Sequence, residues 1–365
     1  MAGSIYGKLF RITTWGESHG KGVGVVVDGC PAGLELSEAD VQKYLDRRRP
    51  GQSEFSTPRS EDDCVEILSG VFEGRTTGTP ISMVVFNKTQ RSRDYSEIAR
   101  YYRPGHADYT FDEKYGFRDY RGGGRSSGRE TIGRVAAGAV AAKLLGALGV
   151  ELLTYTRSIG NIEIDYGRFD RETIGKNMLY MPDSEAAERA GEYVRALRTE
   201  GDSAGGVAEC VVTGIPAGIG ETVFDKLDAE IAKGIMSVGA VKGVEIGDGM
   251  AAARAAGSRN NDSFEMKDGR AVKSTNHSGG TLGGMSDGSP LVIRAAFKPT
   301  PSISKEQRTV SRSGEDITVS IKGRHDPIIV PRAVVVVEAM AALTVADLML
   351  ENMVSRLDRI VEFYR

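Results

Sequence analysis

The chain has 365 residues and a formal net charge of −3, and 40% of its residues are hydrophobic while 27% are charged. This composition is typical of a soluble globular protein and argues against a general nucleic-acid binder, so any basic site must be local. The three cysteines, Cys30, Cys64 and Cys210, are far apart and lack metal-ligand spacing, which favours reduced thiols in a cytoplasmic protein and indicates no metal site.

In the first part of the chain, strands are expected at residues 8–14 and 23–29, on either side of the loop GESHG. A helix follows, with Ser37 as its N-cap, acidic residues in its first turn, arginines in its last turn and Pro50 as its stop. CVEILSGVFEG and ISMVVFN predict a pair of strands. Residues 87–128 are polar and turn-rich, and an irregular stretch of this length is more often functional than idle.

A strong helix is expected next, because Ser127 and Glu130 have the spacing of a capping box and Gly149 stands where the helix should end. The tract IGRVAAGAVAAKLLGALGVELL is apolar, but Arg134 and Lys143 interrupt it, which argues against a membrane span. The remaining expected elements are helices at 184–199, 222–236 and 338–358 and strands at 207–213, 241–246, 290–297 and 316–322.

The sequence contains one internal echo. VDGCPAGL at 27–34 and VTGIPAGI at 212–219 agree in five of eight positions, and each follows an expected strand and precedes an expected helix. Pro-Ala-Gly suits a turn, so a shared turn solution explains the match. An ancient duplication that produced two similar halves explains it equally well.

The stretch RGGGRSSGRET at 121–131 combines glycines, arginines and serines ahead of the expected helix. Glycines allow a ligand to approach the main chain, and the serines and the first helix amides would face an anion. The stretch therefore predicts a phosphate cradle, although a solvated loop has the same composition. A nucleotide-binding P-loop is a near miss, because Arg129 and Glu130 stand where lysine and a magnesium-binding hydroxyl are required.

All four histidines, His19, His106, His277 and His325, stand in glycine-rich or turn-like settings. Histidine can exchange a proton near neutral pH, whereas no pair here has the short helical spacing of a zinc site. Basic residues gather nearby: residues 91–134 contain ten Lys/Arg against seven Asp/Glu. In a chain that is acidic overall, such clusters predict a pocket for a small, multiply charged anion.

Taken together, these stretches resemble the chorismate synthase family. The resemblance extends in family order over nearly the whole chain, and its motifs are GESHG (16–20), DRRRPGQS (46–53), QRSRDY (90–95), RPGHADYT (103–110), RGGGRSSGRET, VKGVEIGDG (241–249), NHSGGTLGG (276–284), KPTPSI (298–303) and GRHDP (323–327). The final helix, from about residue 335, carries little of it.

The resemblance implies conversion of 5-enolpyruvylshikimate 3-phosphate to chorismate by a 1,4-anti elimination of phosphate. It implies a requirement for reduced FMN without net redox change, since the flavin lends electron density and recovers it. It also implies an α/β layered fold, with helices sandwiched between antiparallel sheets, as a single domain over residues 1–365 that assembles as a homotetramer. The substrate carries two carboxylates and a phosphate, which agrees with the basic clusters.

The resemblance also assigns roles to residues. His19 would be the acid near the departing phosphate, His106 would stabilise the charged flavin, and Asp326 would help the proton leave. The residues that would bind FMN are Arg125, Ser126, Ser127, Gly239, Ala240, Gly283, Lys298, Pro299, Thr300, Pro301, Ser302 and Arg324. Those that would bind substrate anions are Arg48, Arg49, Arg129 and Arg134.

Three positions depart from the family pattern. Glu54 stands where a basic residue associated with pyridine-nucleotide contact is common, which indicates that NADPH serves only indirectly, through a separate flavin reductase. Gly239 stands where asparagine is common, so a flavin contact there would use the backbone, and Pro301 replaces a more usual serine.

Two other classes remain as alternatives. A nucleotide-dependent phosphotransferase would need magnesium ligands, and the broken P-loop argues against it. An RNA-binding module would need stacking aromatic residues and a basic surface, and the net charge argues against it.

Overall fold

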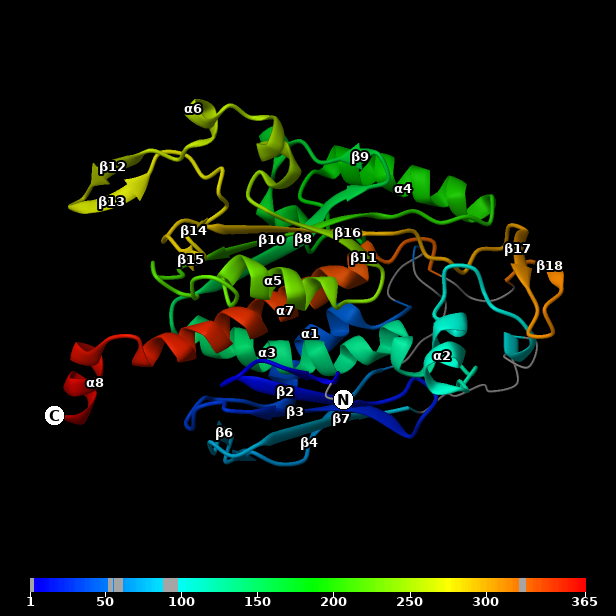
Figure 1. Ribbon diagram of the computed structural model, residues 1–365, viewed down its shortest axis with the longest axis horizontal. Coiled ribbons are helices and arrows are strands. Elements are labelled where there is room, and N and C mark those ends of the chain that lie inside the picture. The colour runs from blue at the N-terminus through cyan, green and yellow to red at the C-terminus, as the bar shows by residue number, and fades with distance from the viewer. Residues whose placement is uncertain (1–2, 52–54, 56–61, 88–97, 322–325) are drawn as a thin grey trace.

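In the computed structural model, which describes residues 3–51, 55, 62–87, 98–321 and 326–365, two antiparallel five-stranded sheets enclose a layer of helices (Figure 1). The first sheet has the order β1 (Ile5–Tyr6), β2 (Arg11–Gly16), β3 (Gly22–Asp28), β7 (Ile81–Phe86), β4 (Val65–Ile67). The second has the order β11 (Val241–Ile246), β16 (Leu291–Phe297), β10 (Gly206–Thr213), β8 (Glu151–Ile159), β9 (Ile162–Glu163). The expected fold class is confirmed.

The helix layer consists of α1 (Glu38–Arg48), α3 (Thr131–Ala147), α5 (Leu227–Met236) and α7 (Val330–Glu351). α3 and α7 cross where a Cβ on Gly138 would lie 2.3 Å from the Ala339 Cβ, so the small residues of α3 permit a close approach of the two backbones. A charged pair joins α1 to α7, where Arg47 donates to both carboxylate oxygens of Glu338 at 2.7 and 2.8 Å. The layer therefore forms a core shared by both sheets.

The smaller elements surround this frame. The peripheral helices are α2 (Asp108–Tyr115), α4 (Ser184–Thr199), α6 (Gly257–Asn260) and α8 (Leu357–Tyr364). The two-stranded hairpins are β5 (Val71–Phe72) with β6 (Arg75–Thr76), β12 (Phe264–Lys267) with β13 (Arg270–Lys273), β14 (Thr281–Leu282) with β15 (Met285–Ser286), and β17 (Gln307–Val310) with β18 (Asp316–Val319).

The two halves of the chain repeat one plan. The first is built in the order β2, β3, α1, β4, β5, β6, β7, α3, and the second in the order β8, β10, α5, β11, β14, β15, β16, α7, apart from insertions. The two Pro-Ala-Gly turns are stabilised by equivalent hydrogen bonds. Thr76 Oγ1 donates to Pro31 O at 2.6 Å, and Ser286 Oγ donates to Pro216 O at 2.6 Å. The repeat thus extends over the whole fold, which is what a duplication predicts and a shared turn does not.

Most expected elements are present, and the differences have local causes. Ser37 caps α1 and forms its capping box with Asp40, as the acidic first turn suggested. A helix, α2, occupies part of the stretch expected to be irregular. α7 begins at Val330, eight residues before the expected start, because Pro331 is compatible with the first turn of a helix.

α7 is also the most apolar α-helix of the described chain. It is long and apolar enough to cross a membrane, but 89% of its most apolar window is buried inside the molecule. It packs against α3, α5 and the second sheet, so its composition reflects a central position in the core (Figure 1).

Candidate active site

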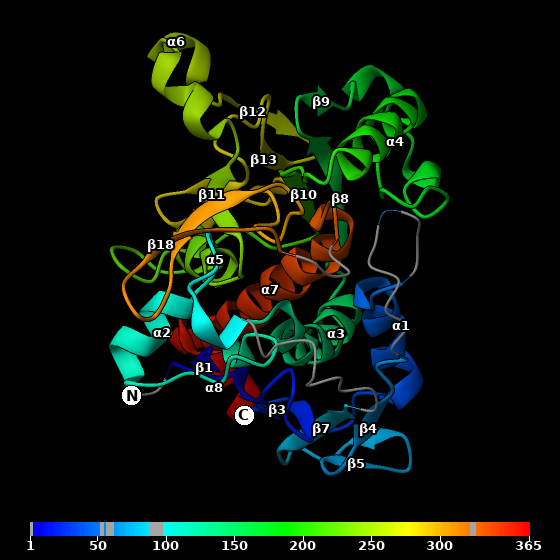
Figure 2. The same ribbon diagram turned by 90° about the vertical axis from the view of Figure 1, so that its right-hand side faces the viewer.

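Two long connections meet at one end of the helix layer. One follows β7 and leads to α3, and the other follows β16 and leads to α7. They touch where Tyr102 N donates to Val310 O at 3.2 Å. α3 and α7 both begin at this end, which faces the viewer in Figure 2, so their positive dipole ends point the same way.

The glycine-rich stretch forms a curved loop beside His19. Gly122, Gly123 and Gly124 have φ angles of +67°, +82° and +53°, which residues with a side chain rarely adopt. A Cβ on Gly122 would lie 2.3 Å from His19 Cδ2, and Ser18 Oγ donates to Gly122 O at 3.1 Å. The bare backbone is therefore needed because the imidazole of His19 packs directly on it. Residues 122–129 are called the cradle below.

The cradle leads into α3 without the expected capping box. Residues Gly128–Glu130 form a 3₁₀ turn, and Ser127 Oγ accepts from Arg129 N at 3.3 Å at the start of that turn. The Glu130 carboxylate accepts instead from Arg134 Nε at 3.0 and 3.1 Å. The capping-box prediction was wrong because an arginine one turn ahead in the sequence competes for the carboxylate.

Arg125 and Ser126 shape the cradle from inside. Arg125 Nη2 donates to Thr14 Oγ1 at 2.8 Å, and its Nη1 donates to Gly16 O at 3.3 Å. Ser126 Oγ donates to Gly123 O at 2.7 Å. Arg125 therefore fastens the cradle to β2, and its positive charge stays at the cradle.

A second cluster surrounds His106. Its Nε2 lies 2.8 Å from Ser302 Oγ, and its Nδ1 lies 2.9 Å from Pro104 O. Lys298 reaches the same loop, because its Nζ donates to Gly105 O at 2.8 Å while its backbone N donates to Ala240 O at 2.9 Å. The structure thus brings together the expected histidine and two of the segments expected to bind FMN, residues 239–240 and 298–302.

The ionisation of His106 follows from this setting. Burial and the neighbouring Arg103 lower the pKa of His106 from 6.5 to about 4, and Lys298 acts in the same direction, while Asp108 and the Pro104 carbonyl oppose it. Arg103 is itself held by Asp108 at 2.7 and 2.8 Å. His106 is therefore neutral near pH 7.

This depressed pKa predicts a pH-dependent stability. The unfolded chain binds a proton at His106 below about pH 6.5, whereas the folded chain does so only below about pH 4, so stability should fall as the pH drops through this window. Replacing His106 by asparagine should make the loss of melting temperature between about pH 7 and about pH 5 smaller than in the parent. An equal loss in both proteins would contradict this assignment.

Asp326 belongs to the second connection, four residues before α7 begins. Arg332, in the first turn of α7, donates to Asp326 Oδ2 at 2.5 Å and through Nε to Arg48 O at 3.0 Å. Pro327, next along the chain, accepts from Ala204 N at 2.9 Å. Arg332 thus fixes Asp326, the residue expected to help the proton leave, relative to the arginine-rich end of α1.

The four arginines expected to bind substrate differ in their surroundings. Arg48 is 4% exposed, and it donates to Thr131 Oγ1, Asp63 Oδ2 and Gly128 O. Arg129 is 12% exposed at the cradle, whereas Arg49 is 41% exposed and lies 3.6 Å from Asp46. Arg134 joins Glu130 to Ser237. Arg129 is therefore the one of these four arginines that belongs to the cradle itself.

The remaining predicted residues fall into three groups. A Cβ added to Gly239 would meet no atom within 4 Å, and Ala240, whose backbone O accepts from Lys298 N, has a φ of +72°. Thr300 O accepts from Ser203 Oγ at 2.7 Å, and the buried Thr300 Oγ1 has no hydrogen-bond partner in the described part of the chain. Gly283 lies in the β14–β15 hairpin at the opposite end of β16 from Lys298, so one chain does not bring it to the His106 cluster. Arg324 and Glu54 lie outside the described residues.

Comparison with known proteins gives a consistent result. The family model described as chorismate synthase matches residues 10–350. A chorismate synthase of Agathobacter rectalis is 69% identical over 100% of both chains, and one of Methanosarcina mazei is 58% identical over 96% of this chain and 97% of its own. A crystal structure of chorismate synthase superimposes with a TM-score of 0.77 at 33% identity, covering 98% of this chain and 97% of that one.

The chain belongs to the chorismate synthase family. Membership confirms the resemblance found in the motifs and the activity class, a carbon–oxygen lyase that forms chorismate at the last step of the shikimate pathway. The family generally uses reduced FMN, which gives the His106 cluster and the cradle a common ligand to consider.

Sequence reasoning missed three members of the site: Asp63, Asn87 and Arg332. Asp63 lies in the acidic run EDD, Asn87 is the last residue of the expected strand ISMVVFN, and Arg332 lies six residues before the expected helix 338–358. The excess of arginines in these clusters could have indicated Asp63, because a buried arginine requires a nearby carboxylate. His277 has another role, since its Nδ1 lies 2.7 Å from Asp248 at the base of the β12–β13 hairpin.

A hollow of about 530 Å³ lies elsewhere, between α4 and residues 173–179. None of the residues predicted for the site lines it. It is therefore separate from the candidate active site.

Proposed function

We propose that the chain converts 5-enolpyruvylshikimate 3-phosphate to chorismate at the junction of the cradle and the His106 cluster, with reduced FMN bound beside the substrate. The observation that best supports this proposal is the contact of His19 with the glycine backbone of the cradle. This contact places a proton-exchanging group next to a loop built for an anion.

The described residues fit FMN. Lys298 supplies a positive charge beside the open backbone at Gly239, and the buried Thr300 Oγ1 is available to a ligand. Arg125 and the two serines that follow it add charge and hydroxyl groups at the cradle. When bound, reduced FMN supplies electron density during the elimination and recovers it. Arg324, Pro299, Pro301 and Gly283 remain proposed contacts.

The chain's own groups account for the proton handling. His19 would hold a proton at the departing phosphate, since an imidazole in contact with the cradle is near the anion. His106, neutral near pH 7, would support negative charge through its bond to Ser302. Asp326, held by Arg332, would accept the proton that the substrate loses.

We also propose a cytoplasmic homotetramer with one domain over residues 1–365. Exposed apolar side chains at the periphery support an assembly, among them Leu357 and Phe363 of α8 and Met266 of β12, which are 76%, 75% and 73% exposed. Gly283 would reach a flavin only in an assembly, from another copy. NADPH would act indirectly, through a separate flavin reductase, because an acidic residue at position 54 would repel its phosphates.

The function is tested under anaerobic conditions with purified protein, substrate and photoreduced FMN. Chorismate should accumulate over many turnovers while the flavin stays reduced, and oxidised FMN should support none. NADPH with oxidised FMN should be inactive until a flavin reductase is added. Oxidation of one flavin for each chorismate formed would refute the proposed chemistry.

A prediction for the cradle concerns Arg125. Arg125→Ala should weaken FMN binding more than it lowers turnover at saturating FMN, because the charge it provides does not change during the reaction. Fluorescence titration of FMN measures the affinity. Lys8→Ala is a suitable control because Lys8 pairs with Asp225 and Glu351. An FMN affinity equal to that of the control would remove Arg125 from the flavin site.

A further inference from the structure

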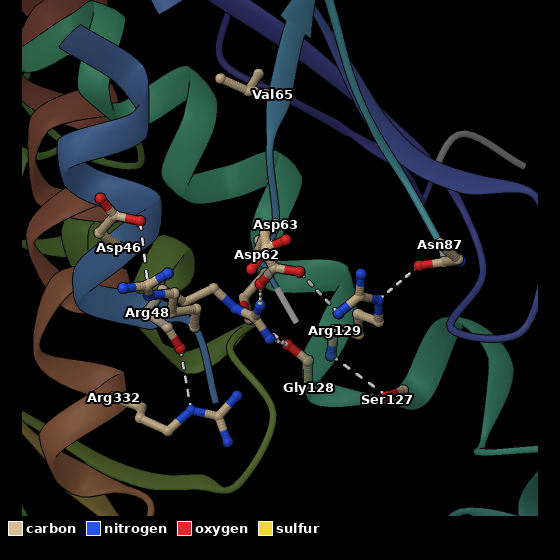
Figure 3. Close-up of polar contacts among 12 residues, drawn as sticks. Asp46, Arg48, Asp62, Asp63, Val65, Asn87, Ser127, Gly128, Arg129 and Arg332 are labelled. Carbon is tan, nitrogen blue, oxygen red and sulfur yellow. Dashed lines mark hydrogen bonds and ion pairs between the residues drawn. The ribbon is translucent and has the colours of Figure 1, made fainter. Parts of the chain in front are cut away.

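We propose that Asp63 and Asn87 are positioning residues that hold Arg129 and the His19 loop in their working arrangement. The inference rests on the proposed function of the cradle. Neither residue belongs to the motifs that identify the family, and neither has another evident reason to be polar and central to this end of the molecule. Figure 3 shows both residues on either side of Arg129.

Asp63 is enclosed by two arginines. Its side chain is fully buried, with Arg48 Nη1 at 2.7 Å from Oδ2 and Arg129 Nη1 at 2.9 Å from Oδ1 (Figure 3). One carboxylate thus fixes two guanidinium groups that come from different helices or turns. The two cations exceed the single anion, so the pair of arginines keeps a positive charge at the cradle.

The backbone of Asp63 indicates why an aspartate stands here. Its φ is +44°, a left-handed conformation that costs free energy in a residue with a side chain and persists only where the surrounding structure imposes it. A purely conformational requirement would favour glycine. Glycine has no carboxylate, so the requirement that selects Asp63 is its charge between Arg48 and Arg129.

Asn87 joins Arg129 to the loop that carries His19. It directly follows β7, and its Oδ1 accepts from Arg129 Nε at 2.7 Å. Its Nδ2 donates to Glu17 O at 3.1 Å and to Gly20 O at 2.9 Å, one residue beyond His19. A single amide therefore sets the distance between the arginine of the cradle and the proton donor.

The contacts of Asp63 and Asn87 give Arg48 and Arg129 different roles. Arg48 is buried and donates to Thr131, Asp63 and Gly128, so its effect on the substrate would pass through Asp63. Arg129 is 12% exposed and lies within the cradle, so it would meet the anion. Asp63 would then govern substrate affinity, and the amide donors of Asn87 would govern the placement of His19 and hence turnover.

The experiment compares Asp63→Asn, Asn87→Asp and Asn87→Ala with Asp183→Asn as a control. Asp183 is equally buried and pairs with Arg168 at 2.9 Å, but it caps α4 far from the cradle. Calorimetric titration of 5-enolpyruvylshikimate 3-phosphate into flavin-free protein measures affinity, and anaerobic turnover with photoreduced FMN gives kcat and KM. Melting temperatures monitor folding.

Asp63→Asn should raise the substrate Kd by about tenfold or more, as expected for loss of one charged hydrogen bond, while Asp183→Asn leaves it unchanged. Asn87→Asp keeps the oxygen that Arg129 uses and loses both amide donors, so kcat at saturating substrate should fall by about tenfold or more. The negative charge that it adds beside Arg129 should also raise the substrate Kd. Asn87→Ala should affect both quantities.

Equal Kd values for Asp63→Asn and Asp183→Asn would overturn the role of Asp63. A normal kcat in Asn87→Asp would overturn the role of Asn87. If Asp63→Asn does not fold, the Asn87→Asp result tests the positioning proposal on its own. Absence of chorismate with the parent protein refutes the proposed function instead, and the calorimetric comparison still tests the positioning of Arg129.

Discussion

Replacing His19 or His106 by alanine should lower turnover by about 10²–10⁴-fold, the usual contribution of a positioned acid or base, with little change in folding. His19 packs on Gly122 of the cradle, and His106 contacts Ser302 within the second cluster. Because the two residues have different roles, each single substitution should lower turnover while the other histidine is still present. Turnover is measured at saturating substrate and photoreduced FMN.

The matched control is His277→Ala, because His277 also stands in a glycine-rich segment but pairs with Asp248 away from the cradle. It should keep turnover within about threefold of the parent protein. Near-normal turnover in both His19→Ala and His106→Ala would refute the proton-handling roles. A loss in His277→Ala as large as theirs would mean that the measurement reports folding.

These expectations show which part of the site was accessible from the sequence. Histidines, glycines and arginines cluster in short segments, so the cradle and its charge were visible from local composition. The pairing of those segments was not, since His106 and Ser302 are separated by 196 positions and meet because two equivalent connections converge. This convergence depends on the duplicated topology. In the sequence, the duplication is visible only as the short match between residues 27–34 and 212–219.

Asp63 illustrates the limit more sharply. In the sequence it is one member of an acidic run, a pattern typical of a solvated surface. In the structure its side chain is completely buried between two guanidinium groups. Burial reverses the significance of a carboxylate, because an ion in the interior requires a partner, and burial cannot be deduced from neighbours along the chain.

Local sequence signals predict helices and strands, but they do not show the tertiary contacts that assemble the site. Hydrophobic period and turn residues act locally, so β10, α4 and β11 lie within a residue of their expected positions. The boundaries that failed were set by tertiary contacts. α3 begins at Thr131 after a 3₁₀ turn because Glu130 binds Arg134, and the run of valines in α7 remains helical because it is buried between α3 and the second sheet.

Gly138→Ala should lower the free energy of unfolding by about 1–3 kcal/mol, the usual cost of adding a methyl group to a filled core. The new Cβ would lie 2.3 Å from the Ala339 Cβ and 2.5 Å from its Cα, so α3 and α7 would have to separate at their crossing. Both helices lead from this crossing to the candidate site, where α3 carries Arg134 and α7 carries Arg332. The loss of stability should therefore be accompanied by weaker substrate binding.

Gly146→Ala provides the opposite expectation on the same helix. No atom lies within 4 Å of a Cβ placed there, and the residue is exposed, so the higher helix propensity of alanine should raise the free energy of unfolding by about 0.5–1 kcal/mol. Urea denaturation of both variants measures the two values. Opposite signs would establish that the separation of α3 and α7, and not glycine content, limits stability. A neutral Gly138→Ala would mean that the helices part without cost, and the close crossing would then not hold the two halves of the site together.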